Sequence, residues 1–229
     1  LQVVALNTWS VAALTSSQIA ALSSAQVSSM STWQFAALET FDVAALATSA
    51  VAALTTAQVV NMTTAQAAAI TAAQAAALAT TQVFYMETRD LAALATVSVA
   101  GLATSAIAVF TTLQAISLTT LQVRALTAAE ILALTTTDLR VMTTSQVAAI
   151  TCATLSAAQV TALTTAQAAV YQSSTPIVLD LNGDGIHTLA VDAGVRFDLL
   201  ANGQAVQTGW VSPQDGLLVR DVNHDGTIN

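Results

Sequence analysis

The chain has 229 residues, enough for one elongated domain and one small one. It carries 13 acidic and 5 basic residues, for a net charge of −8, and an acidic surface repels nucleic acids and anionic membranes. Although 55% of the residues are hydrophobic, Thr, Ser or Gln interrupts the apolar runs, so none reaches the ~18 apolar residues that a spanning helix needs. We therefore expect neither nucleic-acid binding nor membrane insertion.

Large apolar residues recur every eight positions through most of the chain. A second apolar residue stands three positions before each of them, and a Gln or an acid precedes that one, so the consensus octad is Leu-Thr-Thr-Ala-Gln-Val-Ala-Ala. Periodicity this strict predicts a repeat architecture. The series comprises Leu6, Leu14, Leu22, Met30, Leu38, Leu46, Leu54, Met62, Ile70, Leu78, Met86, Leu94, Leu102, Phe110, Leu118, Leu126, Leu134, Met142 and Ile150.

Each octad encodes the start of a helix. Thr-x-x-Gln is a capping box, and the residues that follow it are good helix formers. In one continuous helix, eight residues would rotate the Leu stripe by about 80° per repeat, so the stripe would never form one buried face. We therefore expect a mainly α-helical solenoid, or superhelix, of short capped helices over residues 1–175.

A β-solenoid is the alternative architecture, because Thr and Val favour strands. The abundance of Ala, the near absence of Gly from the repeats and the lack of two-residue alternation all argue against it.

The register breaks once, near Cys152. After Ile150 the next large apolar residues are Leu155, Leu163 and Tyr171, a step of five followed by steps of eight. We expect this slip to kink or re-phase the rod.

Two tryptophans stand at a variable octad position, the residue before the Gln. Trp9 and Trp33 are three octads apart, so they are expected to align along the rod. They either extend the core irregularly or form a contact surface for another copy or a partner.

The composition changes from Pro176 onward. Residues 176–229 contain seven aspartates and most of the glycines, together with strand-like runs around residues 176–179, 195–197 and 216–219. We expect a small β-rich (α+β) module here, with loops that carry function.

Two segments of this module match the first half of an EF-hand loop, in which alternate oxygen ligands surround a hard cation and Gly permits the sharp turn. The Glu that normally ends such a loop is absent, since Val191 holds that position in the first loop and the chain ends inside the second. The motif predicts Ca²⁺ binding. The candidate ligands are Asp180, Asn182, Asp184, Ile186 (carbonyl) and Asp192 in the first loop, and Asp221, Asn223, Asp225, Thr227 (carbonyl) and Asn229 in the second.

Three segments resemble large bacterial proteins of the RTX, or haemolysin-type calcium-binding, class: residues 176–186, 209–213 and 215–221. Octads of the LTTAQVAAL kind are similar to arrays in such proteins. The resemblance implies type I secretion, folding on contact with extracellular calcium, and a role at the cell surface or in the extracellular matrix. The nonapeptide GGxGxDxUx array of that class is absent, and the segment after Phe197-Asp198 lacks a further acidic loop.

No nucleophile elbow, P-loop, HExxH or CxxC motif occurs, so we expect no enzyme. The leading hypothesis is a structural or adhesive segment of a secreted surface or matrix protein that self-associates, even into filaments, and is stabilised by calcium. The alternatives are a calcium-dependent module that binds glycans or the cell surface, and a spacer within a larger secreted enzyme or toxin. The chain begins within an octad and ends within a loop, so we expect it to be part of a longer protein.

Overall fold

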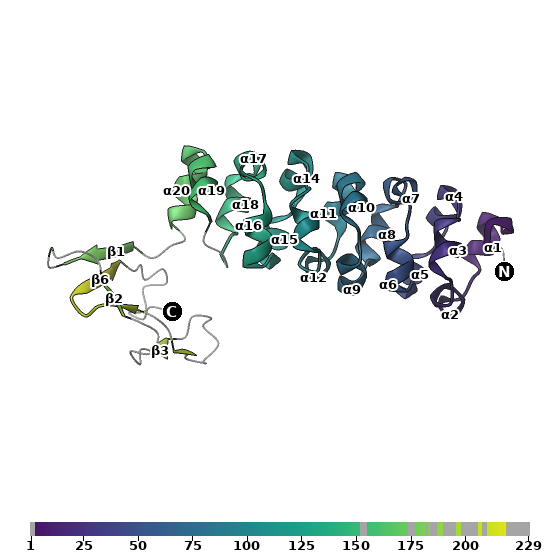
Figure 1. Ribbon diagram of the computed structural model, residues 1–229, viewed down its shortest axis with the longest axis horizontal. Helices are drawn as coiled ribbons and strands as arrows, with labels where there is room; N and C mark the ends of the chain where they lie inside the picture. The colour runs from purple at the N-terminus through teal and green to yellow at the C-terminus, as the bar shows by residue number, and fades with distance from the viewer. Residues whose placement is uncertain are drawn as a thin grey trace. The chain divides into compact units, whose positions relative to one another are not determined.

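The structure, a computed structural model, describes residues 3–151, 155–173, 177–181, 183, 187–189, 196–197, 206–207 and 210–218. The chain divides into two compact units, Leu1–Tyr171 and Gln172–Asn229. The first unit is built from short helices, and the described parts of the second contain short strands (Figure 1).

Each described octad from residue 3 to residue 150 holds one short helix, so the α-solenoid prediction is confirmed and the β-solenoid alternative is not supported. The helices are η1 (Val3–Ala5), α1 (Thr8–Ala12), α2 (Ser16–Ala20), α3 (Ser24–Ser28), α4 (Thr32–Ala36), α5 (Thr40–Ala45), α6 (Thr48–Ala52), α7 (Thr56–Val60), α8 (Thr64–Ala69), α9 (Ala72–Ala76), α10 (Thr80–Tyr85), α11 (Thr88–Ala93), α12 (Thr96–Val99), α13 (Thr104–Ile107), α14 (Thr112–Ser117), α15 (Thr120–Ala125), α16 (Ala128–Ala133), α17 (Thr136–Val141), α18 (Thr144–Ala148), α19 (Ala157–Ala162) and α20 (Thr165–Ser173).

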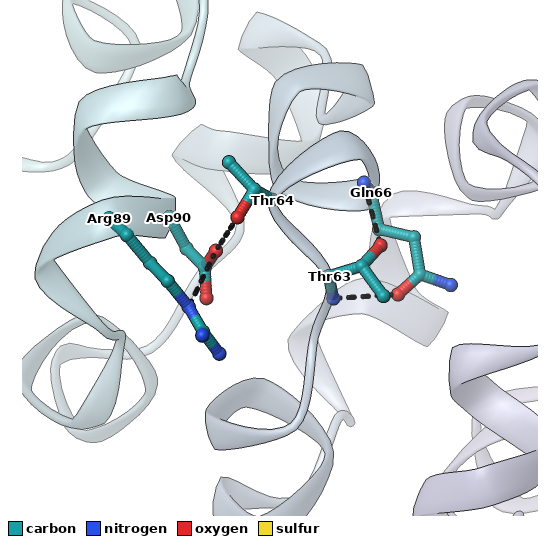
Figure 2. Close-up of polar contacts among 5 residues, drawn as sticks. All are labelled: Thr63, Thr64, Gln66, Arg89 and Asp90. Carbon is teal, nitrogen blue, oxygen red and sulfur yellow. Dashed lines mark hydrogen bonds and ion pairs between the residues drawn. The ribbon is translucent and has the colours of Figure 1, made fainter.

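Capping boxes begin most of these helices, as the sequence predicts. In α8 the Gln66 N–H donates to the Thr63 hydroxyl at 3.2 Å, and the Thr63 N–H donates to Gln66 Oε1 at 3.0 Å (Figure 2). Thr63, the first Thr of the pair, has an extended backbone, with φ −80° and ψ 152°. The chain therefore changes direction at this residue before the next helix begins. The backbone therefore turns once per octad.

Helices three octads apart pack against one another. Contacts of this kind join α2 to α5, α5 to α8, α8 to α11 and α11 to α14. In Figure 1, α14 and α17 lie along one edge of this unit, and α6, α9 and α12 along the opposite edge. The array is thus a superhelix in which about three helices complete one turn, so that each helix packs on the helix three before it and the helix three after it.

The core of the array is formed by the two apolar positions of each octad. Val123 of α15 and Leu126, which follows it, are 0% and 1% exposed, and the equivalent residues up to Ile150 are similarly buried except Leu6, Leu14 and Leu22 near the N-terminus, which are partly buried. Where the inner position shrinks to Ala, as at Ala67, Ala75 and Ala115, it stays fully buried, because neighbouring helices approach the small side chain closely. The periodic apolar series is therefore one continuous core, as the sequence indicates.

The shortened repeat near residue 152 does not re-phase the stacking. Across it, the Gln159 side chain still donates to the carbonyl groups of Ile131 and Leu134, at 3.0 and 2.9 Å. If the short segment between α18 and α19 is counted as one unit, these acceptors lie in the fourth unit back, as they do elsewhere in the array. The bridge thus continues across the shortened repeat with a sequence separation three residues smaller than elsewhere, and re-phasing of the stack is not supported there. Cys152 itself lies outside the described residues.

Strands occupy the described parts of the second unit, in antiparallel pairs β1–β6, β2–β5 and β3–β4. Three of them coincide with the strand-like runs in the sequence. Their bounds are β1 (Ile177–Asp180), β2 (Thr188–Leu189), β3 (Arg196–Phe197), β4 (Val206–Gln207), β5 (Trp210–Val211) and β6 (Asp215–Leu218).

Candidate functional site

A buried Gln links successive turns of the array. Besides its capping bond, Gln66 donates from Nε2 to the carbonyl groups of Phe35 and Leu38, both at 2.8 Å, 31 and 28 residues earlier in the chain. These acceptors lie at the end of α4, the fourth helix back. One side chain therefore caps the start of its own helix and donates to two carbonyl groups where another helix ends.

The same bridge recurs along the array with nearly the same geometry. The Gln side chains are at most 5% exposed, so each bridge is shielded from water. The sequence identifies this position as a cap but gives no sign that it is buried. Bridging bonds from Nε2 are made by Gln34, Gln58, Gln66, Gln74, Gln82, Gln114, Gln122, Gln146, Gln159 and Gln167.

Acids replace the bridging Gln in α5, α11, α16 and α17, at Asp42, Asp90, Glu130 and Asp138. All four side chains are buried, with exposures of 0% to 3%. In Asp42 and Asp90 one carboxylate oxygen is buried and has no hydrogen-bond partner. Buried acceptors without a donor are costly, so these positions differ energetically from the Gln positions.

Two tryptophans are the most exposed of the large apolar residues described. Trp9 on α1 and Trp33 on α4 are 85% and 79% exposed, and the helices that carry them are in contact. Their exposure argues against the first of the two interpretations, in which these residues extend the core irregularly. Between residues 3 and 72 the only charged residues are Glu39 and Asp42, so these rings lie on a nearly uncharged region of the array.

The predicted calcium ligands lie almost entirely outside the described residues. Asp180 is the last residue of β1, and Gly183 in the same loop has φ +79°, a left-handed conformation that suits the sharp turn of a cation-binding loop. The predicted ligands outside the described residues are Asn182, Asp184, Ile186, Asp192, Asp221, Asn223, Asp225, Thr227 and Asn229.

A further acid, Asp215, is buried beside the first loop. It is 7% exposed, and its Oδ2 accepts hydrogen bonds from the His187 N–H at 2.8 Å and from the Ser212 hydroxyl at 2.9 Å. Its Oδ1 is buried and has no hydrogen-bond partner. In the β1–β6 register Asp215 stands directly opposite Asp180.

Asp215 lies outside both EF-hand-like matches, so these motifs do not identify it as a candidate ligand. The turn before it was the available signal. Ser212-Pro213-Gln214-Asp215 places Pro second in a turn that is closed by the Asp215 N–H donating to the Ser212 carbonyl at 3.1 Å. That turn holds the acid close to His187, the eighth residue of the first predicted loop.

Among the described residues, no helix is both long enough and apolar enough to cross a bilayer. Within the same residues, no group of three or more His, Cys, Asp and Glu side chains is placed to hold a metal ion. The second finding does not test the calcium prediction, whose ligands lie elsewhere.

Comparison with known proteins gives separate matches to the two parts of the chain. Residues 2–32 and 35–72 match the model of the ALTTAQ repeat, and residues 177–229 match that of the SPM domain. A stretch of 61 residues, 26% of this chain, is 51% identical to the iron-regulated protein FrpA of Neisseria meningitidis serogroup C, and it covers 6% of that protein. No solved structure matches the chain. The chain is thus a repetitive protein that spans a small part of the length of this relative.

Proposed function

We propose that the repeat array is a structural segment of a secreted bacterial surface or extracellular-matrix protein. The buried Gln bridge is the observation that carries this proposal. Because buried Gln side chains tie many of the helices to the fourth unit back, stability is a sum over the octads and over the contacts between neighbouring turns, and it does not require one fixed number of octads. Such an array suits a spacer or fibre whose length varies by whole repeats.

The proposal is tested by measuring how the length of the array scales with the number of octads. Small-angle scattering is applied to the full chain and to a chain from which four complete octads, residues 39–70, have been removed. A maximum dimension that shortens in proportion to the octads removed supports a rod. An unchanged dimension, or a globular profile, contradicts it.

The part of the chain from residue 176 onward is proposed to bind calcium. The buried, unpartnered Oδ1 of Asp215, which stands opposite Asp180 in the strand pair, is suited to a hard cation. Carboxylate, amide and carbonyl oxygens from the two Asp- and Asn-rich loops would complete the coordination. Binding outside the cell, where calcium is abundant, would couple folding of this unit to export.

Isothermal titration calorimetry of the full chain with Ca²⁺ tests whether the chain binds calcium. Heat of binding at or below millimolar Ca²⁺, reduced in Asp215→Asn, is expected. The exposed acid Glu87 serves as the matched control, since Glu87→Gln removes the same charge from the repeat array. Absence of heat with the wild-type chain contradicts calcium binding, and an unaltered isotherm for Asp215→Asn excludes Asp215 as a ligand.

Glycan binding is the second candidate function, and the exposed Trp9 and Trp33 favour it. A neutral sugar ring can pack on an indole face, and the surroundings of these residues are nearly uncharged. Binding of neutral oligosaccharides, with and without Ca²⁺, should then be lost in Trp9→Ala/Trp33→Ala. Self-association through the same rings would instead give concentration-dependent light scattering that the double variant abolishes.

A further inference from the structure

Asp90 occupies a bridging position without having the donor that the bridge requires. It is the third residue of α11 and is 0% exposed. Its Oδ1 accepts a hydrogen bond from the Thr64 hydroxyl at 3.0 Å and lies 3.6 Å from Arg89 Nε (Figure 2). Its Oδ2 is buried and has no hydrogen-bond partner.

Neighbouring bridges show what a side chain at this position does. Gln82 lies one octad before Asp90, and Gln122 lies four octads after it. Each donates from Nε2 to the carbonyl groups 31 and 28 residues earlier in the chain. The equivalent carbonyl groups for position 90 are those of Val59 and Met62, at the end of α7. An ionised carboxylate is only an acceptor, whereas a protonated one has an O–H to donate.

We propose that Asp90 is a protonation site within the array, and that its neutral carboxyl group takes the place of the Gln amide as donor toward the end of α7. The O–H donates to the carbonyl group of Val59 or Met62, directly or through one water. The bond between these turns therefore forms only while the carboxyl group holds its proton.

Few charges surround Asp90. Arg89 and Glu87 belong to its own helical unit, and Tyr85 ends the helix before it. The packed helices α8 and α14 and the fourth helix back, α7, contain no titratable residue. Burial raises the pKa of Asp90 above its ordinary 3.8, and Glu87 adds to the rise, while the Thr64 hydrogen bond and Arg89 oppose it. The burial of Asp90 and the few charges around it thus favour its protonated form.

The direction of the pH effect follows from linkage. Because the pKa of Asp90 is higher in the folded chain than in the unfolded one, the folded chain holds the proton more tightly. The stability that protonated Asp90 contributes is fully present at pH values below its ordinary pKa of 3.8. It is lost as pH rises through the raised pKa of Asp90 in the folded chain. Acid therefore strengthens this interface, opposite to the effect at a carboxylate held in an ion pair.

The experiment compares thermal melting of the full chain and of Asp90→Gln between pH 4 and pH 7. The variant restores the usual amide, so its melting temperature should exceed that of the wild type at pH 7, and the difference should shrink toward pH 4. Gln66→Glu should install the same pH dependence at a second bridge. Glu39→Gln, at an exposed acid, is the charge-matched control and should leave the pH dependence of the wild type unchanged.

A direct titration keeps the proposal falsifiable if a variant fails to fold. Carbon-detected NMR of the Asp90 carboxyl carbon in the wild-type chain should give a midpoint above 3.8. A midpoint at or below that value overturns the proposal, as does an Asp90→Gln variant whose melting temperature differs from that of the wild type by the same amount at every pH.

Discussion

At the scale of single residues, the array depends on a polar side chain as much as on its apolar ones. Gln122 accepts from the Thr119 N–H at 2.8 Å and donates to the Leu91 and Leu94 carbonyl groups at 3.0 and 2.8 Å. Only a side chain with both a donor and an acceptor at its end can do this. The recurrence of Gln follows from that requirement.

Gln122→Met tests the energetic importance of the bridge. Met keeps the volume of the side chain but removes the bridging partner of the Leu94 carbonyl group and the capping partner of the Thr119 N–H, and it leaves the Leu91 carbonyl group with only its bond from the Leu94 N–H. We expect a loss of about 3 kcal/mol in the free energy of unfolding, because each unsatisfied buried group costs about 1–3 kcal/mol. Equilibrium urea unfolding followed by circular dichroism measures it.

Gln18→Met is the matched control. Gln18 makes the capping bond to Thr15, but its side chain is exposed. Loss of this cap should cost about 1 kcal/mol or less. Equal losses at the two positions would mean that the bridge adds nothing beyond the cap.

At the scale of the helix, no element of the array is stable alone. Most helices have four to six residues, far below the ~12–15 that an isolated helix needs for even marginal stability. Caps fix where each helix begins, and packing on the helices of neighbouring turns provides the stability. Close approach is therefore essential, and at Gly101 a side chain would meet the main chain of a neighbouring helix.

Gly101→Ala should destabilise the array. A Cβ at this position would lie 2.8 Å from the main-chain oxygen of Ala72, an atom that cannot move without shifting α9. We expect a loss of about 1–3 kcal/mol from overpacking, measured by thermal or urea unfolding. Ala93→Gly, at the same octad position, should cost only about 0.5–1 kcal/mol. Stabilisation by Gly101→Ala would show that the helices separate freely there.

The sequence was sufficient to predict the helices because caps and propensities are local. Thr63 and Gln66 lie within one octad, so their pairing follows from spacing alone. The bridge from Gln66 to Phe35 and Leu38 could not be predicted, because it depends on how many helices complete a turn. Asp215 was missed for a similar reason: strand pairing, not local sequence, places it near Asp180.

At the scale of the whole molecule, the array should tolerate changes made in complete octads. Deleting residues 63–70 moves the acceptors of the bridges that span the deletion, such as those of Gln74 and Gln82, to the preceding octad, where equivalent apolar and carbonyl groups are present. We expect helix content per residue to be unchanged by circular dichroism and unfolding to stay cooperative. Replacing the same residues with Gly and Ser keeps the length but removes the cap and the bridge. A deletion that harms the array more than this replacement contradicts a stack of equivalent units.

The most direct test of the superhelix is a set of distances between spin labels. Cysteines are placed at the exposed positions Ala25, Phe41 and Ser49, on α3, α5 and α6, in a chain whose natural cysteine is replaced by serine. Because α3 packs on α6, we expect the 25–49 distance to be shorter than the 25–41 distance, although its sequence separation is larger. Distances that simply increase with sequence separation would contradict the superhelix and the scaffold role proposed from it.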